Sequence, residues 1–367
     1  MVDIIAAGHI CLDLLPGMSM VPLANIASPG KLFEVDALNV ATGGSVSNTG
    51  LALHRLGVDV GLMGKVGDDL TGRVIIAYLT DHDEHLADFV KVLPGEASSY
   101  TVVLSPENSD RIFLHCAGAN TTFGVADIDF EKVKTAKIFH LGYPQLLPRT
   151  FTDDGAELLQ IFQQAKAAGV ITSLDTAMPD PSKASGKANW HHILEKTLPH
   201  VDIFIPSYEE LLVMLRPDDY VNWESDLFAH LSLALLDELT DELLDMGVAI
   251  TGVKLADAGL YLRSTPDSDR LQIFEKLLSD VSLWQNVRLY HPAYAINLVG
   301  TTGAGDSAYG AVLAALLNGL PPEQTARVAN MVGGCACEAS DASGGILSWD
   351  ATLKRLKNNP LSDYQIS

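Results

Sequence analysis

The chain has 367 residues, of which 47% are hydrophobic and 19% are charged, and its formal net charge is −22 at pH 7. Nucleic acids and anionic membranes are bound through clustered Lys and Arg, so we expect neither as a partner of so acidic a chain. ATP is not excluded, because a local site can override a distant field that salt screens over about 10 Å. The length alone suggests about two domains, although single α/β domains can be this long.

Neither the cysteines nor the N-terminus indicates an oxidising compartment or a membrane. The cysteines fit neither a disulfide framework nor zinc-type pairs, and we expect reduced, mostly buried thiols. Residues 1–3 lead directly into a strand-like run, and no apolar run is long enough to span a bilayer. We therefore predict a cytoplasmic protein. The four cysteines are Cys11, Cys116, Cys335 and Cys337.

Short apolar runs alternate with helical patterns along most of the chain, as in a parallel sheet covered by helices on both faces. This pattern predicts an α/β fold. The predicted strands are residues 4–7, 60–63, 138–141, 170–174, 203–205, 248–253 and 260–263. The predicted helices between them include residues 45–56, 155–168 and 209–215.

Two segments, residues 14–39 and 98–117, interrupt the alternation. In the second, residues 100–104 and 111–114 are rich in β-forming side chains and flank a Pro-Glu-Asn-Ser-Asp turn, which predicts a hairpin. Two further stretches are expected to be helical or loop-rich surface additions without assignable chemistry. These stretches are residues 220–246 and 264–284.

Candidate binding residues for a polyol occur near the N-terminus. Asp13 lies just past a strand end and can accept two hydroxyl hydrogen bonds. Gly44 and Asn48 are four residues apart at a helix start, so both can face one opening, where Gly43 and Gly44 allow close approach. The Asn48 amide can donate to and accept from a hydroxyl group. The alternatives are a turn residue for Asp13 and a helix N-cap cluster for residues 45–48. His9, Trp190, His191 and His192 are expected to pack or to lie on a surface helix, because no metal-ligand spacing accompanies them.

An apolar stretch near the C-terminus runs into residues 300–306, of sequence GTTGAGD, and a helix is predicted over residues 307–318. The helix prediction rests on an i, i+3, i+4, i+7, i+8 apolar stripe that Gly319 closes. The glycines then sit at a helix N-terminus, where unpaired amides and the helix dipole can hold a phosphoryl group. Asp306 adds a carboxylate that can accept the proton of an attacking hydroxyl. The stripe consists of Ala308, Ala311, Val312, Ala315 and Leu316.

Two alternative interpretations of this glycine run exist. One is a tight turn without a ligand. The other is a dinucleotide-binding fingerprint over Gly303, Gly305 and Ala308. We reject the second, because Asp306 would place a carboxylate against a pyrophosphate bound without metal, and the acidic residue some twenty positions on, Glu323, lies in a Pro-Pro turn.

The run resembles the Asp-Thr-x-Gly-Ala-Gly-Asp signature of the ribokinase-like (PfkB) family of carbohydrate and nucleoside kinases. Residues 8–13 are similar to the family's Gly-x-x-x-x-Asp, and residues 43–48, 56–57 and 64–72 to its N-terminal signature. The resemblance implies one kinase domain over residues 1–367, with a three-layer α/β/α core and a largely parallel sheet. It also implies a small β-sheet lid formed by about residues 14–39 and 98–117, and a homodimer through the lid strands.

The chain departs from the family pattern at several positions. Gly300 replaces the first Asp of the signature, which leaves activation by a monovalent cation such as K⁺ open. The family's metal-organising Asn-x-x-Glu corresponds to residues 207–210, with Ser207 in place of Asn and Glu210 retained. Glu210 can hold Mg²⁺ through water, and its alternative role is to favour a helix N-terminus. In the nucleotide loop at residues 253–259, Lys254 and Ala256 are substituted and Gly259 is kept.

Together these features predict transfer of the ATP γ-phosphoryl group to a hydroxyl of a sugar or nucleoside. Asp306 would be the base, kept ionised by the helix N-terminus, and the amides of residues 303–306 would form the anion hole. The alternatives are a nucleoside (adenosine-type) kinase, a catalytically weak sugar-binding regulator and a nicotinamide-dependent oxidoreductase. The predicted site comprises Asp306, Gly303, Ala304 and Gly305 for catalysis, Asp13, Gly43, Gly44 and Asn48 for the acceptor, Thr302, Gly259, Lys254 and Asn330 for ATP, and Glu210 for Mg²⁺.

Overall fold

A central eight-stranded sheet organises the protein in this computed structural model, which describes residues 2–18, 21, 29–105, 112–223, 226–339, 341–362, 364 and 366. The strand order is β14-β13-β12-β11-β10-β9-β1-β4, and β13 runs antiparallel to both of its neighbours, β12 and β14, whereas the other pairs are parallel. The largely parallel sheet predicted from the sequence is therefore confirmed. The strands are β1 (Ile4–Gly8), β4 (Val60–Met63), β9 (Ile138–Gly142), β10 (Ile171–Asp175), β11 (Ile203–Phe204), β12 (Ile250–Lys254), β13 (Leu260–Ser264) and β14 (Arg288–His291).

The sheet is buried on both faces, which explains why its strands read as continuous apolar runs. In β1, Ile4 and Ala6 belong to one hydrophobic cluster, whereas Ile5 and Ala7 belong to the other. This division follows from the pleat, because successive side chains of a strand point to opposite faces.

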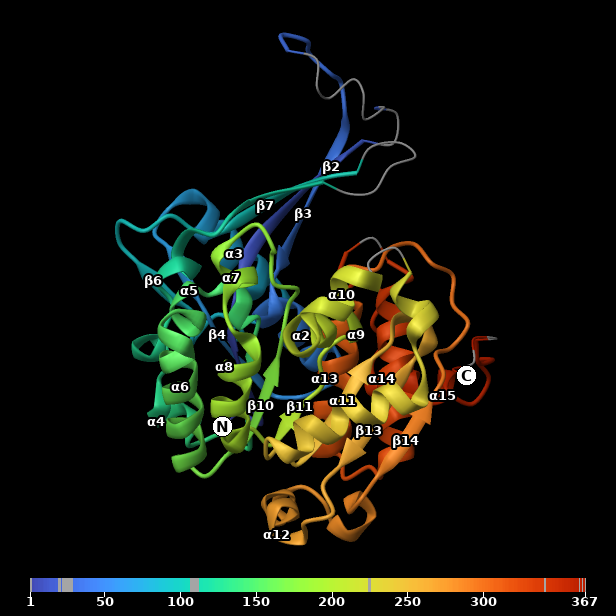
Figure 1. Ribbon diagram of the computed structural model, residues 1–367. Helices are drawn as coiled ribbons and strands as arrows, with labels where there is room; N and C mark the ends of the chain where they lie inside the picture. Colours follow the sequence, from blue (N-terminus) through green and yellow to red (C-terminus); the bar gives the residue numbers. More distant parts are fainter. Residues whose placement is uncertain are drawn as a thin grey trace.

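Helices cover each face and complete the three layers (Figure 1). The larger cluster packs α2, α3, α13, α14 and α15 against the sheet, and the other cluster packs α6, α8, α9 and α11. The helices are α2 (Ser45–Arg55), α3 (Leu70–His82), α4 (Phe130–Val133), α5 (Pro148–Phe151), α6 (Ala156–Ala167), α7 (Ala184–Lys187), α8 (Trp190–Thr197), α9 (Tyr208–Leu215), α10 (Pro217–Trp223), α11 (Leu233–Asp245), α12 (Ser268–Leu271), α13 (Ala304–Leu317), α14 (Pro322–Ala336) and α15 (Trp349–Arg355).

The two stretches expected to be surface additions contribute to the core instead. Helix α11 buries Leu236, Leu239 and Leu243 completely. The segment that contains α12 buries Phe274 and Trp284. The prediction was wrong because the i, i+3, i+7 spacing of the α11 leucines, which marks a core-facing helix, was not weighed.

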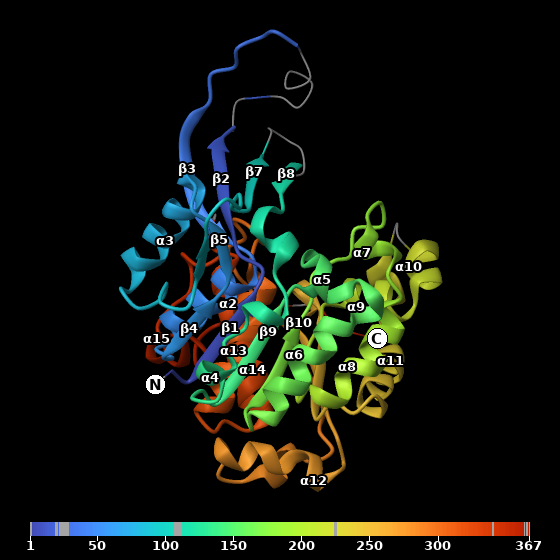
Figure 2. The same ribbon diagram turned by 90° about the vertical axis from the view of Figure 1, so that its left-hand side faces the viewer.

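A separate four-stranded sheet, the lid sheet, rises above the carboxyl ends of β1 and β9 (Figures 1 and 2). The predicted hairpin is confirmed, because β7 and β8 pair antiparallel with Tyr100 opposite Cys116. Its turn at residues 106–111, and residues 19–20 and 22–28 of the other lid segment, lie outside the described residues. The strands are β2 (Cys11–Gly17), β3 (Asp36–Gly43), β7 (Tyr100–Leu104) and β8 (Ile112–Cys116), and a third small sheet pairs β5 (Lys65–Gly67) with β6 (Lys91–Leu93).

All four cysteines are free, and Cys11 and Cys335 are buried. Among the described residues, no helix is both long enough and apolar enough to cross a membrane.

Candidate active site

The glycine run forms the N-terminus of α13, but the helix begins at Ala304 rather than at the predicted Ser307. Gly303 is the N-cap residue and has φ 71°, a left-handed conformation that favours glycine. A Cβ atom at Gly303 would also lie 2.5 Å from the Cβ atom of Ala342. Apolar periodicity predicted a later start, because the first turn contains no large apolar side chain that would mark it.

The earlier start changes which amides can hold an anion. The Ala304 N–H donates to the Thr301 carbonyl oxygen at 3.3 Å. The N–H groups of Gly305 and Asp306 lie in the first turn of the helix, where amides have no acceptor within the helix itself. A Cβ atom at Gly305 would point toward the Lys254 ammonium group, 3.6 Å away. The amides that could hold an anion are therefore those of Gly305 and Asp306, with Gly303 and Ala304 shaping the turn.

Asp306 is 3% exposed and is held by two donors. Its Oδ2 atom accepts from the Tyr143 hydroxyl at 2.7 Å and from Asn48 Nδ2 at 3.0 Å. Its Oδ1 atom has no partner among the described residues. One carboxylate oxygen is thus anchored and the other is left for a ligand.

Burial raises the pKa of Asp306 above its ordinary value, although the bond from Tyr143 and the charge of Lys254 oppose this shift. The helix N-terminus was expected to keep the carboxylate ionised. The raised pKa acts against the ionised form, because burial removes the carboxylate from water and disfavours its charge.

Helix α13 is fixed to the sheet by Tyr309. The Tyr309 hydroxyl donates to the carbonyl oxygens of Leu174 at 2.9 Å and Ile203 at 3.0 Å, and accepts from Ser173 Oγ at 3.0 Å. Nearly the whole helix is buried, so the predicted one-sided stripe understated its packing. These contacts hold the Asp306 carboxylate in a fixed position relative to the strand ends.

A buried ion pair lies beside this helix terminus. Lys254, at the end of β12, places Nζ 2.7 Å from Asp175 Oδ1, at the end of β10. Burial raises the pKa of Asp175 to about 7. The charge of Lys254 opposes this shift, whereas the nearby carboxylates of Glu210 and Asp306 add to it. Burial lowers the pKa of Lys254, but these carboxylates outweigh it and leave that pKa above its ordinary value. The sequence predicted a role for Lys254 but not for Asp175, although a carboxylate at the end of a strand could have indicated it.

Glu210 caps a helix and also lines the cavity described next. Its Oε2 atom accepts from the Ser207 N–H at 2.9 Å, and the Ser207 hydroxyl accepts from the Glu210 N–H, which together form a capping box at the start of α9. The same oxygen accepts from Thr176 Oγ1 at 2.9 Å. Ser207 and Glu210 also line the cavity described next, so the cap presents a carboxylate to it.

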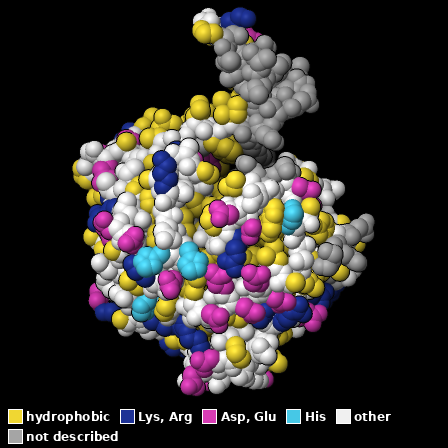
Figure 3. Space-filling view, viewed as in Figure 1, with side chains coloured by type: hydrophobic (Ala, Val, Ile, Leu, Met, Phe, Trp, Pro, Cys, Tyr) yellow, Lys and Arg dark blue, Asp and Glu magenta, His cyan; other side chains and the backbone are white. Residues whose placement is uncertain are grey.

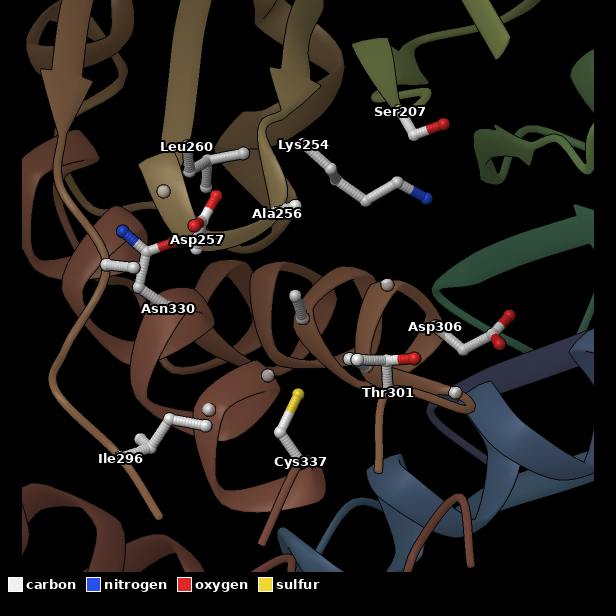
Figure 4. A pocket seen from close by; sticks show the side chains of 18 of the residues that line it. Ser207, Lys254, Ala256, Asp257, Leu260, Ile296, Thr301, Asp306, Asn330 and Cys337 are labelled. Atoms are coloured by element: carbon white, nitrogen blue, oxygen red, sulfur yellow. The ribbon is translucent and has the colours of Figure 1, made fainter. Parts of the chain in front are cut away.

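A cavity of about 740 Å³ extends from Asp306 across α13 to β13 and α14 (Figure 4). Lys254 reaches from β12 toward the side where Asp306 lies (Figure 4). Asn330 lines the far end, where its Nδ2 atom donates to the His291 carbonyl oxygen at 2.9 Å. Gly259 has φ 106°, and a Cβ atom there would lie 2.2 Å from that same oxygen. Thr301 lines the cavity, whereas Thr302 is not among its lining residues.

The predicted acceptor residues gather on the other side of Asp306, beneath the lid sheet. Asp13 lies on β2, and a Cβ atom at Gly43 would lie 2.2 Å from Asp13 Oδ2. Gly44 has φ 85° and packs against His9, while Asn48 contacts Asp306. Burial raises the pKa of Asp13. The fold thus brings all four residues to one place.

Two further residues on this side were not predicted. Tyr143 reaches Asp306 from the end of β9, and burial raises its pKa well above the ordinary value, so the hydroxyl stays a donor. His9, which was expected only to pack, lies with its ring centroid 6.3 Å from that of Tyr143 and 5.5 Å from that of His115 on β8. No sequence spacing could have indicated either residue, because the contacts of Tyr143 and His9 join distant segments of the chain.

The sequence profile of the pfkB family carbohydrate kinases matches residues 20–349. The chain belongs to the pfkB family. An uncharacterized sugar kinase of Archaeoglobus fulgidus is 25% identical to this pfkB protein over 81% of the chain and 98% of the relative. Fructokinase-1 of rice (Oryza sativa) is 24% identical over 84% and 81% of the two chains. The 5-dehydro-2-deoxygluconokinase of Clostridium perfringens is 30% identical over 47% and 48%.

Solved structures confirm the ribokinase-like fold. The ribokinase of Arabidopsis thaliana, solved with ribose and ATP, superposes with a TM-score of 0.70 at 19% identity, covering 97% of this chain and 99% of that one. A putative ribokinase II of E. coli, solved with ATP and Mg²⁺, gives a TM-score of 0.71 at 19% identity over 97% and 99% of the chains. This pfkB protein is accordingly a carbohydrate kinase with a ribokinase-like fold.

Proposed function

We propose that this protein transfers the γ-phosphoryl group of ATP to a hydroxyl group of a sugar, with Asp306 as the base. The observation that carries this proposal is the Asp306 carboxylate itself. It lies between an acceptor region and a nucleotide-sized cavity, with one oxygen anchored and the other unpaired among the described residues. A base in that position can hold the hydroxyl for in-line attack and take its proton.

The chain's own groups account for the charge that develops during transfer. The first-turn amides of Gly305 and Asp306 and the ammonium group of Lys254 converge on the same space beside Asp306. Transfer of a phosphoryl group is catalysed mainly by positioning and by electrostatic stabilisation, and this set of donors supplies both. The lid sheet carries Asp13 and would limit the access of water to the acceptor.

The residues present fit a Mg²⁺ ion that is bound mainly through water. Among the described residues, no group of three or more His, Cys, Asp and Glu side chains could hold a metal directly. Glu210 nevertheless lines the cavity, and Asp175, which pairs with the cavity-lining Lys254, has its Oδ2 atom buried without a partner in the described chain. Mg²⁺ keeps several waters and needs few protein ligands, so these carboxylates could hold its hydration shell. The ion would supply charge that neutralises the phosphate oxygens.

The names of the relatives favour a sugar acceptor over a nucleoside, and activity over mere binding. Fructokinase names a neutral sugar as acceptor, whereas 5-dehydro-2-deoxygluconokinase names a sugar acid. The intact Asp306 and its two donors argue against a catalytically weak regulator. We retain the cytoplasm as the proposed location.

An ATP-consumption screen with Mg²⁺ tests the proposal. Candidate acceptors are aldoses, ketoses, sugar acids and nucleosides, each measured with and without K⁺, which Gly300 leaves open. We expect ADP release that depends on a sugar and exceeds the acceptor-free rate at least tenfold. ADP release at the acceptor-free rate with every compound, together with retained sugar binding, would favour the regulator.

We also propose a homodimer formed through the lid sheet. Its outer strands expose large apolar side chains, among them Leu38 (54% exposed) and Phe113 (59%), and Figure 3 shows apolar side chains gathered below the lid. Exposed apolar patches and unpaired strand edges mark interaction surfaces. The double variant Leu38→Asp/Phe113→Asp should sediment as a monomer at micromolar concentration, where the unmodified protein sediments as a dimer.

The matched control for this experiment is Val221→Asp on α10, which alters a residue that is 69% exposed and lies outside the lid. It should leave the sedimentation coefficient of the dimer unchanged. A monomeric unmodified protein under the same conditions would rule out the lid dimer.

A further inference from the structure

We infer that the acceptor is an uncharged polyhydroxy compound and that the imidazole of His9 binds one of its hydroxyl groups. This inference rests on the proposed kinase function and narrows it to one chemical class. It separates neutral sugars from the sugar acids and sugar phosphates that a carbohydrate kinase could also use.

In the part of the chain that the structure describes, the unpartnered polar groups around Asp306 and the start of α2 include two oxygens that can only accept, together with the hydroxyl groups of Ser45, Ser47 and Thr49. Asp306 Oδ1 and Asn48 Oδ1 are buried and have no hydrogen-bond partner among the described residues. The Asn48 amide nitrogen is already committed to Asp306. A carboxylate oxygen and an amide oxygen can only accept, so a ligand that satisfies them must bring hydrogen-bond donors. Hydroxyl groups do so, whereas ionised carboxylates and phosphates cannot.

The charged groups on the acceptor side also favour an uncharged ligand. Within the described part of the chain, neither Asp13 nor Asp306 forms an ion pair with Lys or Arg. Lys183, whose charge acts on His115, is 70% exposed and pairs with Asp180 at 3.1 Å. Lys254 lies on the nucleotide side and is bound to Asp175. An anionic acceptor would therefore meet two carboxylates without a dedicated cation, at a cost that burial increases.

His9 supplies a hydrogen-bond donor, which the carboxylates lack. Its side chain is 2% exposed, and both ring nitrogens are without a partner among the described residues. Its backbone oxygen accepts from the Val46 N–H at 3.1 Å, which fixes it against the start of α2. The ring packs against Gly44 and lies near the rings of Tyr143, which contacts Asp306, and His115, which is on the lid sheet.

The His9 imidazole is neutral across the working pH range. Burial, together with a smaller contribution from the charge of His115, lowers its pKa to about 3. A neutral imidazole has one donor and one acceptor nitrogen. A hydroxyl group matches these two nitrogens, because it can accept from the protonated nitrogen and donate to the other. The uncharged ring gives no net electrostatic attraction to an anion.

The first test compares neutral acceptors with anionic derivatives of the same sugars, such as a ketohexose with its 6-phosphate and an aldohexose with its uronic acid. We expect kcat/KM to be at least about 100-fold higher for the neutral member of each pair. Higher kcat/KM for the anionic member would overturn the inference. Calorimetric titration of the same pairs, without ATP, keeps the test separate from the kinase proposal. Binding of the neutral member supports the inference even if no acceptor drives ATP consumption, and binding of the anionic member alone, or of neither, overturns it.

The second test replaces His9. His9→Phe keeps a planar ring but removes both nitrogens, and it should raise KM for the sugar about tenfold while KM for ATP stays unchanged. His9→Asn keeps a donor and an acceptor and should restore part of the sugar affinity. Thermal unfolding of both variants checks that they fold. An unchanged sugar KM in folded His9→Phe, or an equal loss for ATP, would overturn the role of His9.

Discussion

Replacement of Asp306 by Asn should lower kcat by roughly 100-fold or more while nucleotide affinity changes little. The amide oxygen can still accept from Tyr143 and Asn48, so the geometry of the helix terminus is kept. The variant loses the group that takes the hydroxyl proton. Steady-state kinetics, together with titration of ADP into the protein, measures the two quantities separately.

The pH dependence gives a second readout of the same carboxylate. Because burial raises the pKa of Asp306, the base becomes protonated at a higher pH than an ordinary Asp. Activity should therefore fall as pH falls through that raised pKa, and this acid limb should be absent from the residual activity of Asp306→Asn. Asp13→Asn serves as the matched control and should raise the sugar KM more than it lowers kcat. An unchanged kcat in Asp306→Asn would remove Asp306 from the mechanism.

Replacement of Lys254 by Met should lower kcat/KM for ATP by roughly 10- to 100-fold, because the ammonium group lies beside the first turn of α13. The loss of its charge should also raise the pKa of Asp306 further, since Lys254 opposes the effect of burial. The acid limb of the pH profile should then move to higher pH. Initial rates measured across the pH range test both consequences.

If Lys254 only neutralised Asp175 and had no part in catalysis, a different result would be expected. Breaking a buried ion pair leaves an uncompensated charge and costs about 3–5 kcal/mol of stability. The double variant Lys254→Met/Asp175→Asn removes both charges, so it should recover much of the stability without recovering activity. Recovery of activity along with stability would show that Lys254 only neutralises Asp175.

The sequence was most informative where function depends on neighbouring residues. Gly303, Gly305 and Asp306 lie within four positions, and a helix N-terminus combines them by local geometry alone. The helix boundary was misplaced because the first turn of α13 is built from small residues, and apolar periodicity cannot detect it. The consequence was a different set of amides for the anion hole.

Contacts between distant segments could not be derived in this way. Tyr143 and Asp306 are joined across the sheet by a bond between residues 163 positions apart. Asp175 and Lys254 meet because β10 and β12 end at the same edge of the sheet, with β11 between them. No spacing rule reports such proximity. The direction of the Asp306 pKa shift could not be derived from spacing either, because it depends on burial that follows from the packing of α13.

The most direct test of this account is phosphorus NMR of the purified protein with ATP, Mg²⁺ and a neutral sugar. The account predicts that the γ-phosphate resonance of ATP disappears as a sugar phosphomonoester resonance of equal intensity grows, and that Asp306→Asn slows both changes together. Release of inorganic phosphate without a phosphomonoester, or transfer at the unmodified rate by Asp306→Asn, would contradict it.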